Sequence, residues 1–363
     1  MAARLSAVVA ASVLGLSNAA SAPFAVSDAT YPSAGGGSAV HTKVLTNLET
    51  GECAEILASW GGKLERVALR RGSGHPVRPV IASRCPTSGQ CTAEMLQGDA
   101  SPGAMLIPFA NRVDKGVYTF GGDTHHLSPD NSTVSHGFLI QGRPLRTVRQ
   151  DATATAATVV LGVMLNGTDP GYPFVVDVTI TYRLDAAGLW VTVNGRNAMQ
   201  GLPAPFMVGC HPYFKLQHST FDNATLKLDR TCTEWNRAWQ TLDQVPNGTT
   251  SPFHGFTGSD TIAAPHTTCP ACTDPPHWDD GFAALASGAE CSNVTLRLRD
   301  GGDTLLLRMD RSFRFTQVYS GRAPSELAVE PMSSATNAFN NEDGLIVLEA
   351  GAEWEGTFGI GLE

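Results

Sequence analysis

Charged side chains are scarce in this sequence. Asp, Glu, Lys and Arg make up 16% of the 363 residues, and the formal net charge is -9 at pH 7. No long run or stripe of Lys and Arg occurs along the chain. Nucleic acids and anionic membrane surfaces are bound through clustered positive charge. The composition therefore argues against both as partners and favours a neutral or cationic ligand.

Long apolar runs and helical periodicity are also missing. Beyond the first 22 residues, no apolar segment is long enough to span a bilayer as a helix. The same part of the sequence contains no pattern typical of a long amphipathic helix and no repeat of fixed period. These absences argue against a helical bundle, a helical membrane protein and a repeat array.

The N-terminus has the layout of a secretory signal peptide. In "MAARLSAVVAASVLGLSNAASA", Arg4 precedes a short apolar run that ends in the small residues Ala20, Ser21 and Ala22. We predict a signal peptide over residues 1–22; the alternative is an apolar N-terminal helix. After its removal we expect no membrane association, and "SAGGGS" at Ser33–Ser38 is interpreted as a flexible connection behind the leader.

Sequons and cysteines fit the same secretory interpretation. N-x-S/T sequons, which accept glycans only in a eukaryotic secretory route, occur at Asn131, Asn166, Asn223, Asn247 and Asn293. The eight cysteines are an even number, which in an exported chain indicates disulfides. Cys85 and Cys91 are close enough to pair locally, and so are Cys269 and Cys272 in "CPAC". Spacing alone does not determine the connectivity. We therefore predict a secreted glycoprotein with disulfides.

Strand-like patterns fill most of the remaining chain. Segments such as "FVVDVTITYRL", "LWVTVNG", "DTLLLRMD" and "FRFTQVYS" alternate or are rich in β-branched and aromatic residues. Turn signals such as "DAAG" and "DGGD" separate them. We predict an all-β protein, a large antiparallel β-sandwich, with residues 23–363 as one domain. Residues 241–281 are rich in Pro, Gly, Thr and His, and we expect long loops there.

Two segments in the first half of the chain contain candidate binding residues. In "LIPFANRVDKGVYTFGG", Asn111 and Arg112 follow an apolar strand, and the guanidinium could bind substrate hydroxyls. The alternative is a surface arginine at a hairpin. In "NSTVSHGFLIQGRPLRTV", Gly137 would allow the backbone at His136 to approach another chain segment closely. The alternative for His136 is a structural loop histidine.

Two later segments contain candidate proton carriers. In "VGCHPYFKL", Pro212 favours an extended backbone at His211, whose imidazole could act as an acid or base. The alternative is a core histidine that bonds to a backbone carbonyl. Glu330 comes after the apolar "LAV" and directly before Pro331, at the expected end of a strand. A carboxylate there is costly to bury unless it is paired or used; the alternative is a strand that ends at the surface.

Together and in this order, the four segments resemble the aldose 1-epimerases, or mutarotases, of the galactose mutarotase-like fold. The matching elements are "FANRVDKGVYTFGG", "SHGFLIQGRPLR", "GCHPYFKL" and "AVEPMSSATNAFN", and the closing "LIVLEAGAEWEGTFGI" is similar to the last hairpin of the family. The resemblance spans roughly residue 40 to the end. It implies a galactose mutarotase-like supersandwich and the interconversion of the α and β anomers of a free aldose of glucose or galactose type.

The resemblance also implies roles for individual residues. Glu330 would be the base at the C1 hydroxyl, and His211 would be the acid at the ring oxygen. Proton transfer of this kind needs no metal and no other cofactor. His136 would bond a sugar oxygen, and Arg112, with Asn111 behind it, would hold ring hydroxyls.

One further aspartate is implied at the site. In "HWDDGF", Asp279 is favoured over Asp280 for binding further hydroxyls. Trp278 or Phe282 could provide an apolar platform for the sugar, although packing in the core is an equal alternative. For the assembly we expect a monomer or a weak dimer.

Three other interpretations remain open. A hexose-6-phosphate mutarotase of the same fold would need clustered basic residues, for which Arg143 and Arg146 are the candidates. A non-catalytic carbohydrate-binding protein would have no use for both His211 and Glu330. A metal-dependent hydrolase would use His277 together with Asp279 and His211, although their spacing matches no established metal motif.

Overall fold

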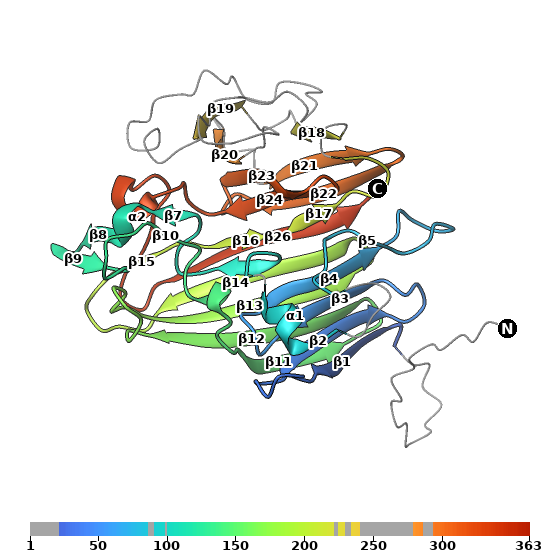
Figure 1. The fold of residues 1–363 in the computed structure, drawn as a ribbon, viewed down its shortest axis with the longest axis horizontal. Helices are drawn as coiled ribbons and strands as arrows, with labels where there is room; N and C mark the ends of the chain where they lie inside the picture. Colours follow the sequence, from blue (N-terminus) through green and yellow to red (C-terminus); the bar gives the residue numbers. More distant parts are fainter. Residues whose placement is uncertain are drawn as a thin grey trace.

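The structure is a computed structural model that describes residues 22–85, 91–98, 100–220, 224–228, 234–239, 279–285 and 293–363. The predicted signal peptide, apart from Ala22, lies outside the described residues. Three large antiparallel sheets dominate the described part of the chain (Figure 1). Its α-helices are short, namely α1 (Ala93–Gly98) and α2 (Ala338–Asn341), together with the 3-10 turns η1 (Asp114–Gly116) and η2 (Leu139–Gln141). The prediction of an all-β antiparallel architecture is confirmed.

An eight-stranded sheet forms one layer of the sandwich. Its order is β11-β12-β13-β14-β26-β22-β21-β18. The strands are β11 (Arg146–Ala152), β12 (Ala156–Asn166), β13 (Val175–Asp185), β14 (Gly188–Asn197), β18 (Thr225–Leu228), β21 (Asn293–Asp300), β22 (Asp303–Asp310) and β26 (Glu353–Leu362). In β13 every second side chain, from Val176 to Leu184, is buried, and the residues between them are half-exposed. This period of two is the pattern of a strand with one face on the core.

A five-stranded and a seven-stranded sheet form the opposite layer. The first has the order β1-β2-β3-β4-β5, with β1 (Phe24–Tyr31), β2 (Val40–Asn47), β3 (Cys53–Leu57), β4 (Lys63–Leu69) and β5 (Arg78–Pro79). The second has the order β19-β20-β23-β24-β16-β6, and β17 also pairs with β24. Its strands are β6 (Ala104–Leu106), β16 (Gly209–His211), β17 (Tyr213–Lys215), β19 (Glu234–Trp239), β20 (Asp279–Leu285), β23 (Phe315–Ala323) and β24 (Glu326–Met332).

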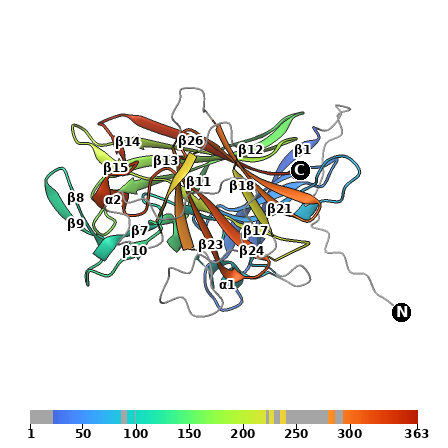
Figure 2. The same ribbon diagram turned by 90° about the horizontal axis from the view of Figure 1, so that it is seen from above.

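The chain segment after β5 connects these two sheets. The N–H of Ala82 donates to the carbonyl of Tyr213, and the N–H of Lys215 donates to the carbonyl of Val80. These bonds extend the ladder from the five-stranded sheet into β17 of the seven-stranded sheet. Figure 2 shows β12, β13, β14 and β26 along one side of the molecule and β17, β23 and β24 along the other. One contiguous apolar core lies between them and draws side chains from all three sheets.

Three small two-stranded sheets complete the described fold. They pair β7 (Arg112–Val113) with β10 (Val134–Ser135), β8 (Val117–Phe120) with β9 (Asp123–His126), and β15 (Ala204–Phe206) with β25 (Ile346–Leu348). The β8–β9 hairpin extends from one end of the molecule (Figure 1). No helix in the described part of the chain is long and apolar enough to cross a membrane.

Two sequence expectations about connections need correction. The segment Ser33–Ser38 does not precede the domain, because it lies between β1 and β2, which pair along their full length. The segment is the loop that joins these two strands, and its glycines can adopt the positive φ angles that turns require. Residues 279–281, which we expected in a long loop, begin β20. Residues 241–278 lie outside the described residues.

The cysteines follow the prediction only in part. Cys85 and Cys91, whose spacing allows local pairing, form a disulfide. Cys53 in β3 and Cys210 in β16 are buried free thiols, so an even number of cysteines did not mean that all of them pair. A buried cysteine packs as a small apolar side chain, which suits both core strands. Cys269 and Cys272 lie outside the described residues.

We expected the backbone after His136 to approach another chain segment closely, and Gly137 allows a test of this contact. Its φ of 69° is left-handed, and a Cβ at this position would overlap the carbonyl oxygen of Ile107. We predict that Gly137→Ala lowers the free energy of unfolding by about 2 kcal/mol or more, measured by urea denaturation.

Gly36→Ala is the matched control. Gly36 also has a positive φ, 82°, but a Cβ there would meet no atom within 4 Å. We expect this variant to lose only about 1 kcal/mol. Equal losses in the two variants would show that the contact with Ile107 contributes nothing.

Candidate functional site

A polar cavity of about 320 Å³ lies where β16, β20, β23 and β24 meet the β7–β10 pair. Its volume is at the lower end of the range of small-molecule sites, which is about 300–1,000 Å³. The residues that line it are Ser101, Asn111, Arg112, His136, His211, Tyr213, Asp279, Gln317, Tyr319 and Glu330. All six residues predicted as site residues, from segments far apart in the sequence, are therefore brought together.

His211 and Glu330 face each other across two neighbouring strands. β24 pairs antiparallel with β16 and with β17 in one continuous register. Within this register His211 is directly opposite Glu330, at a position where antiparallel strands bring side chains closest together. Nε2 of His211 lies 3.3 Å from Oε1 of Glu330, and both side chains are almost fully buried.

Two prolines interrupt the ladder at this point. Pro212 follows His211 and Pro331 follows Glu330, and neither proline has an N–H to donate. Next to the interruption, the N–H of Val329 still donates to the carbonyl of Pro212 at 3.3 Å. Strand pairing therefore resumes on both sides of the opposed imidazole and carboxyl groups.

The position of Glu330 corrects one expectation. It is not at the end of its strand, because β24 continues through Pro331 to Met332. The strand tolerates the proline because Thr316 of β23 pairs with it on one side, while the ladder is interrupted on the other. Glu330 is 1% exposed, so the interpretation of a strand that ends at the surface is wrong.

The β7–β10 pair brings His136 beside Asn111 and Arg112. Arg112 pairs with Ser135, and the N–H of His136 donates to the carbonyl of Asn111 at 2.9 Å. Asn111 has a φ of 54° and His136 a φ of 71°, both left-handed. Asparagine tolerates this conformation, whereas histidine does so less readily. Two neighbouring strained residues at one cavity are typical of a functional site.

Four side chains form a closed ring of hydrogen bonds along one wall of the cavity. Arg112 donates from Nη1 to Oδ1 of Asn111 at 3.0 Å and from Nη2 to Oδ2 of Asp279 at 2.9 Å. Gln317 donates from Nε2 to Oδ1 of Asp279 at 2.7 Å and accepts from Nδ2 of Asn111 at 3.0 Å. Each member therefore fixes the orientation of its neighbours before any ligand binds.

Gln317 was missed by the sequence reasoning. It lies in β23 directly opposite Glu330 and is 4% exposed. A signal was present, because in "FRFTQVYS" it shares one face of the strand with Phe313, Phe315 and Tyr319. A polar residue at an apolar position of an alternating strand indicates a buried hydrogen-bonding role.

Two aromatic contacts hold the ring of His211. The ring of Tyr213 stacks on it with centroids 4.9 Å apart and an interplanar angle of 21°. The ring of His136 meets it edge-on, with centroids 5.4 Å apart. The imidazole can therefore turn little within the cavity.

Burial controls the ionisation of the opposed pair. It raises the pKa of Glu330 well above its ordinary value, with a further increase from the charge of Asp279. Burial lowers the pKa of His211 well below 6.5, and the neighbouring His136 lowers it further. The pKa of His136 falls to about 4, mainly through burial and then through Arg112. Burial therefore favours the uncharged forms of the Glu330 carboxyl and of both imidazoles.

Three buried polar atoms of the cavity lack a hydrogen-bond partner within the described structure. They are Nδ1 of His136, Nδ1 of His211 and Oε2 of Glu330. An unsatisfied buried polar atom costs about 1–3 kcal/mol. A ligand rich in hydroxyl groups, which both donate and accept, matches such a set.

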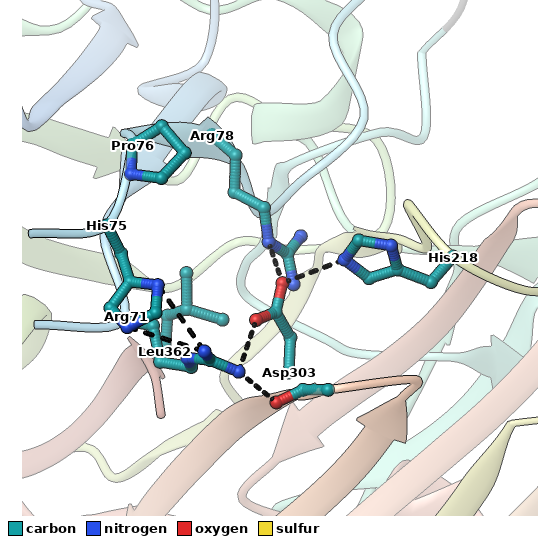
Figure 3. Close-up of a pocket in the computed structure, with 8 residues that line it drawn as sticks. Arg71, His75, Pro76, Arg78, His218, Asp303 and Leu362 are labelled. Carbon is teal, nitrogen blue, oxygen red and sulfur yellow. Dashed lines mark hydrogen bonds and ion pairs between the residues drawn. The ribbon is translucent and has the colours of Figure 1, made fainter.

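A second cavity of about the same volume, 320 Å³, lies between the β4–β5 connection and the β21–β22 turn (Figure 3). Its charged groups pair with one another. Asp303 forms ion pairs with Arg78 at 2.6 Å, with Arg71 at 3.5 Å and with His218 at 3.3 Å. These ion pairs join the two layers and leave the charged groups already paired with one another. The first cavity is therefore the candidate active site.

The remaining candidates lie elsewhere or outside the described residues. His277 and Trp278 are among the latter, and for Asp280 and Phe282 only the backbone in β20 is described. Among the described residues, no group of three His, Cys, Asp or Glu side chains is arranged to hold a metal ion. The metal-dependent alternative therefore has no support in the described part of the chain.

Comparisons with known proteins agree with the geometry. The family model of aldose 1-epimerase matches residues 87–361. The uncharacterized protein YihR of Escherichia coli K12 is 30% identical over 259 residues, 69% of this chain and 75% of the relative. The aldose 1-epimerase of the same organism is 28% identical over 192 residues, 47% of this chain and 54% of that enzyme.

Solved structures have the same fold. The galactose 1-epimerase of Lactobacillus acidophilus superposes with a TM-score of 0.71 at 17% identity, over 94% of this chain and 99% of that one. The GalM/aldose epimerase homologue of C. elegans gives a TM-score of 0.68 at 18% identity, over 87% and 96%. This chain belongs to the aldose 1-epimerase family and has a galactose mutarotase-like β-sandwich fold.

The raised pKa of Glu330 predicts how stability depends on pH. The folded protein keeps this proton to higher pH than the unfolded chain, whose carboxyl ionises near 4.5. The contribution to stability is therefore complete below about pH 4.5 and is lost as the pH rises toward the folded pKa. Glu330→Gln removes this dependence. We expect the variant to be more stable than wild type at neutral pH, by an excess that grows by at most about 1.4 kcal/mol per pH unit.

Urea denaturation at several pH values between 4 and 8 measures this difference. The control is Glu353→Gln, which changes an exposed carboxylate at the start of β26. A constant difference between wild type and Glu330→Gln over this range would contradict the burial argument.

Proposed function

We propose that the protein is an aldose 1-epimerase that interconverts the α and β anomers of a free hexose. The observation that carries the proposal is the opposed pair of Glu330 and His211, 3.3 Å apart and buried in a polar cavity. Mutarotation needs one group that accepts a proton and one that donates it. A carboxyl and an imidazole that face each other at this distance can supply both.

The proposed reaction has two halves. The base takes the proton of the C1 hydroxyl, the bond between C1 and the ring oxygen breaks, and the acid protonates the ring oxygen. The open-chain aldehyde turns about its C1–C2 bond. Closure on the other face reverses both proton transfers and regenerates the pair.

Glu330 is assigned as the base and His211 as the acid. Burial favours the protonated carboxyl and the neutral imidazole, so this assignment requires a proton to move from Glu330 to His211 when sugar binds. Sugar hydroxyls that donate to the carboxylate favour its ionised form. Oε2 of Glu330 and Nδ1 of His211, which have no partner within the described structure, support this role for the ligand.

The rest of the cavity would hold the sugar in place. Arg112, Asn111 and Asp279 already fix one another, so they can bind ring hydroxyls with little loss of side-chain entropy. His136, neutral at pH 7, can donate to or accept from a sugar oxygen. We assign all four to substrate binding.

The other carbohydrate functions are less well supported. Arg143 forms an ion pair with Asp169, and Arg146 lies in the edge strand β11 of the eight-stranded sheet. Neither is among the described residues that line the cavity, whose one cationic side chain, Arg112, is paired with Asp279. The described lining residues therefore offer no unpaired cationic side chain to a 6-phosphate. A non-catalytic binding protein would not explain two buried, opposed ionisable groups.

Polarimetry of freshly dissolved α-D-glucose and α-D-galactose tests the proposal. We expect wild type to speed relaxation to the same final rotation, with activity falling at low pH, when both groups are protonated, and at high pH, when neither is. Glu330→Gln and His211→Ala should each lower kcat by about 100-fold or more.

Two comparisons complete this experiment. Glucose 6-phosphate should relax no faster with the enzyme than without it. A Glu330→Gln variant that binds sugar and matches the wild-type rate would sink the proposal, and the carbohydrate-binding interpretation would then replace it.

We further propose that the protein is exported with its leader removed after Ala22. The leader motivates this, and the sequons Asn131 and Asn166, whose side chains are exposed, suit glycan attachment in a eukaryotic host. N-terminal sequencing and intact mass of protein purified from its own host are the measurements. An N-terminus at Met1 would rule out cleavage.

A further inference from the structure

The chain between α1 and β6 passes directly behind the candidate acid. Of this segment, residues 100–103 are described, and Ser101 lines the cavity. The N–H of Gly103 donates to the carbonyl of His211 at 2.8 Å. Ala104, the next residue, pairs with His211 in the β6–β16 ladder. The backbone position of His211 therefore depends on this loop.

Two buried cations hold the loop from the other side. Nζ of Lys63 donates to the carbonyl of Ala100 at 2.8 Å, and Nη2 of Arg84 donates to the carbonyl of Pro102. Lys63 is 0% exposed, and the Arg84 side chain is 2% exposed. A hydrogen bond from a charged donor is stronger than a neutral one, by roughly a factor of two. The carbonyls on either side of Ser101 are therefore both fixed by charge-assisted bonds.

The strand β4 organises this bracing. Lys63, Leu64 and Glu65 are consecutive buried residues of β4, at a point where its register against β3 shifts by one residue. Glu65 binds Nη1 of Arg84 at 2.9 Å and also accepts from the N–H of Arg84 at 2.7 Å. The N–H of Leu64, between them, donates to the carbonyl of Gly103 at 2.9 Å. One strand thus holds the loop through its backbone and through two side chains.

A buried ion pair is a costly way to gain stability. Desolvating two charges often cancels their attraction, and apolar substitutes of similar size are frequently as stable. A core that needed only to be filled would not require Lys63, Glu65 and Arg84 beside a loop. Directed, charge-assisted bonds instead fix the position of a backbone.

We propose that Lys63 and Arg84 are positioning residues, which act through the loop of residues 100–103 to hold His211 opposite Glu330. This inference rests on the proposed function for its kinetic consequence, but not for the placement of His211. Neither cation lines the cavity within the described structure. They set the alignment of the proton carrier rather than contact the sugar.

Kinetics of three variants test the proposal. Lys63→Met removes one brace, and Glu65→Gln combined with Arg84→Met removes the other without leaving a buried carboxylate unpaired. We expect each to lower kcat by tenfold or more and to change KM by less than about threefold. Arg84→Lys keeps a charged donor and should recover a large part of kcat.

Tyr31→Phe is the matched control. It removes the partly buried hydrogen bond from the hydroxyl of Tyr31 to Glu55, 2.6 Å, in the same five-stranded sheet, and removes no bond of either brace. It should lower the thermal unfolding midpoint while leaving kcat unchanged. Equal loss of kcat in the control and in the brace variants would reduce the braces to general stability and overturn the proposal.

The ring NMR signals of His211 give a second readout that needs no turnover. They should shift or broaden in both brace variants and stay unchanged in Tyr31→Phe. Unchanged signals in the brace variants would overturn the inference even in an active enzyme. A wild type without activity, but with the expected NMR changes, would reject the proposed function and leave the positioning role standing.

Discussion

The opposition of His211 and Glu330 across an antiparallel pair is the constraint on which the site depends. β24 keeps one register with β16 and β17, so neither side chain can move away without a slip of the strand. Pro212 and Pro331 interrupt the ladder at that point and nowhere else along this pairing. The other lining residues form the walls around this pair. They include the hydrogen-bonded ring that contains Gln317 and the tyrosine ring of Tyr213, which stacks on His211.

This arrangement lowers the stability of the fold. A carboxyl and two imidazoles lie in a place where burial opposes their charged forms, and two residues at the same cavity have left-handed backbones. Such features persist when the surrounding structure is strong enough to hold them. Here the strength comes from the continuous apolar core under three sheets and from a ladder that runs through both sheets of the second layer.

Much of this could be predicted from the sequence, and the limits have physical causes. Strand alternation indicated the all-β class, and the motifs around Asn111, His136, His211 and Glu330 indicated the site. Which residues face each other could not be predicted, because register depends on partner strands more than 100 residues away. Gln317 was missed although its polar side chain interrupts an apolar face of its strand, because its partners Asn111 and Asp279 come from other segments of the chain. "AVEP" misled because proline usually ends a strand unless the neighbouring ladder is already interrupted.

The cavity draws its walls from residues 101 to 330, and no two adjacent elements of the chain could form it alone. Most of its contacts are therefore distant in sequence, and such contacts form only after long stretches of chain have been brought together. A ligand that recognises the finished cavity binds none of the partly folded chains. Ligand binding would then raise the free energy of unfolding of the whole domain. A bound ligand would show that every segment that lines the cavity has reached its native position.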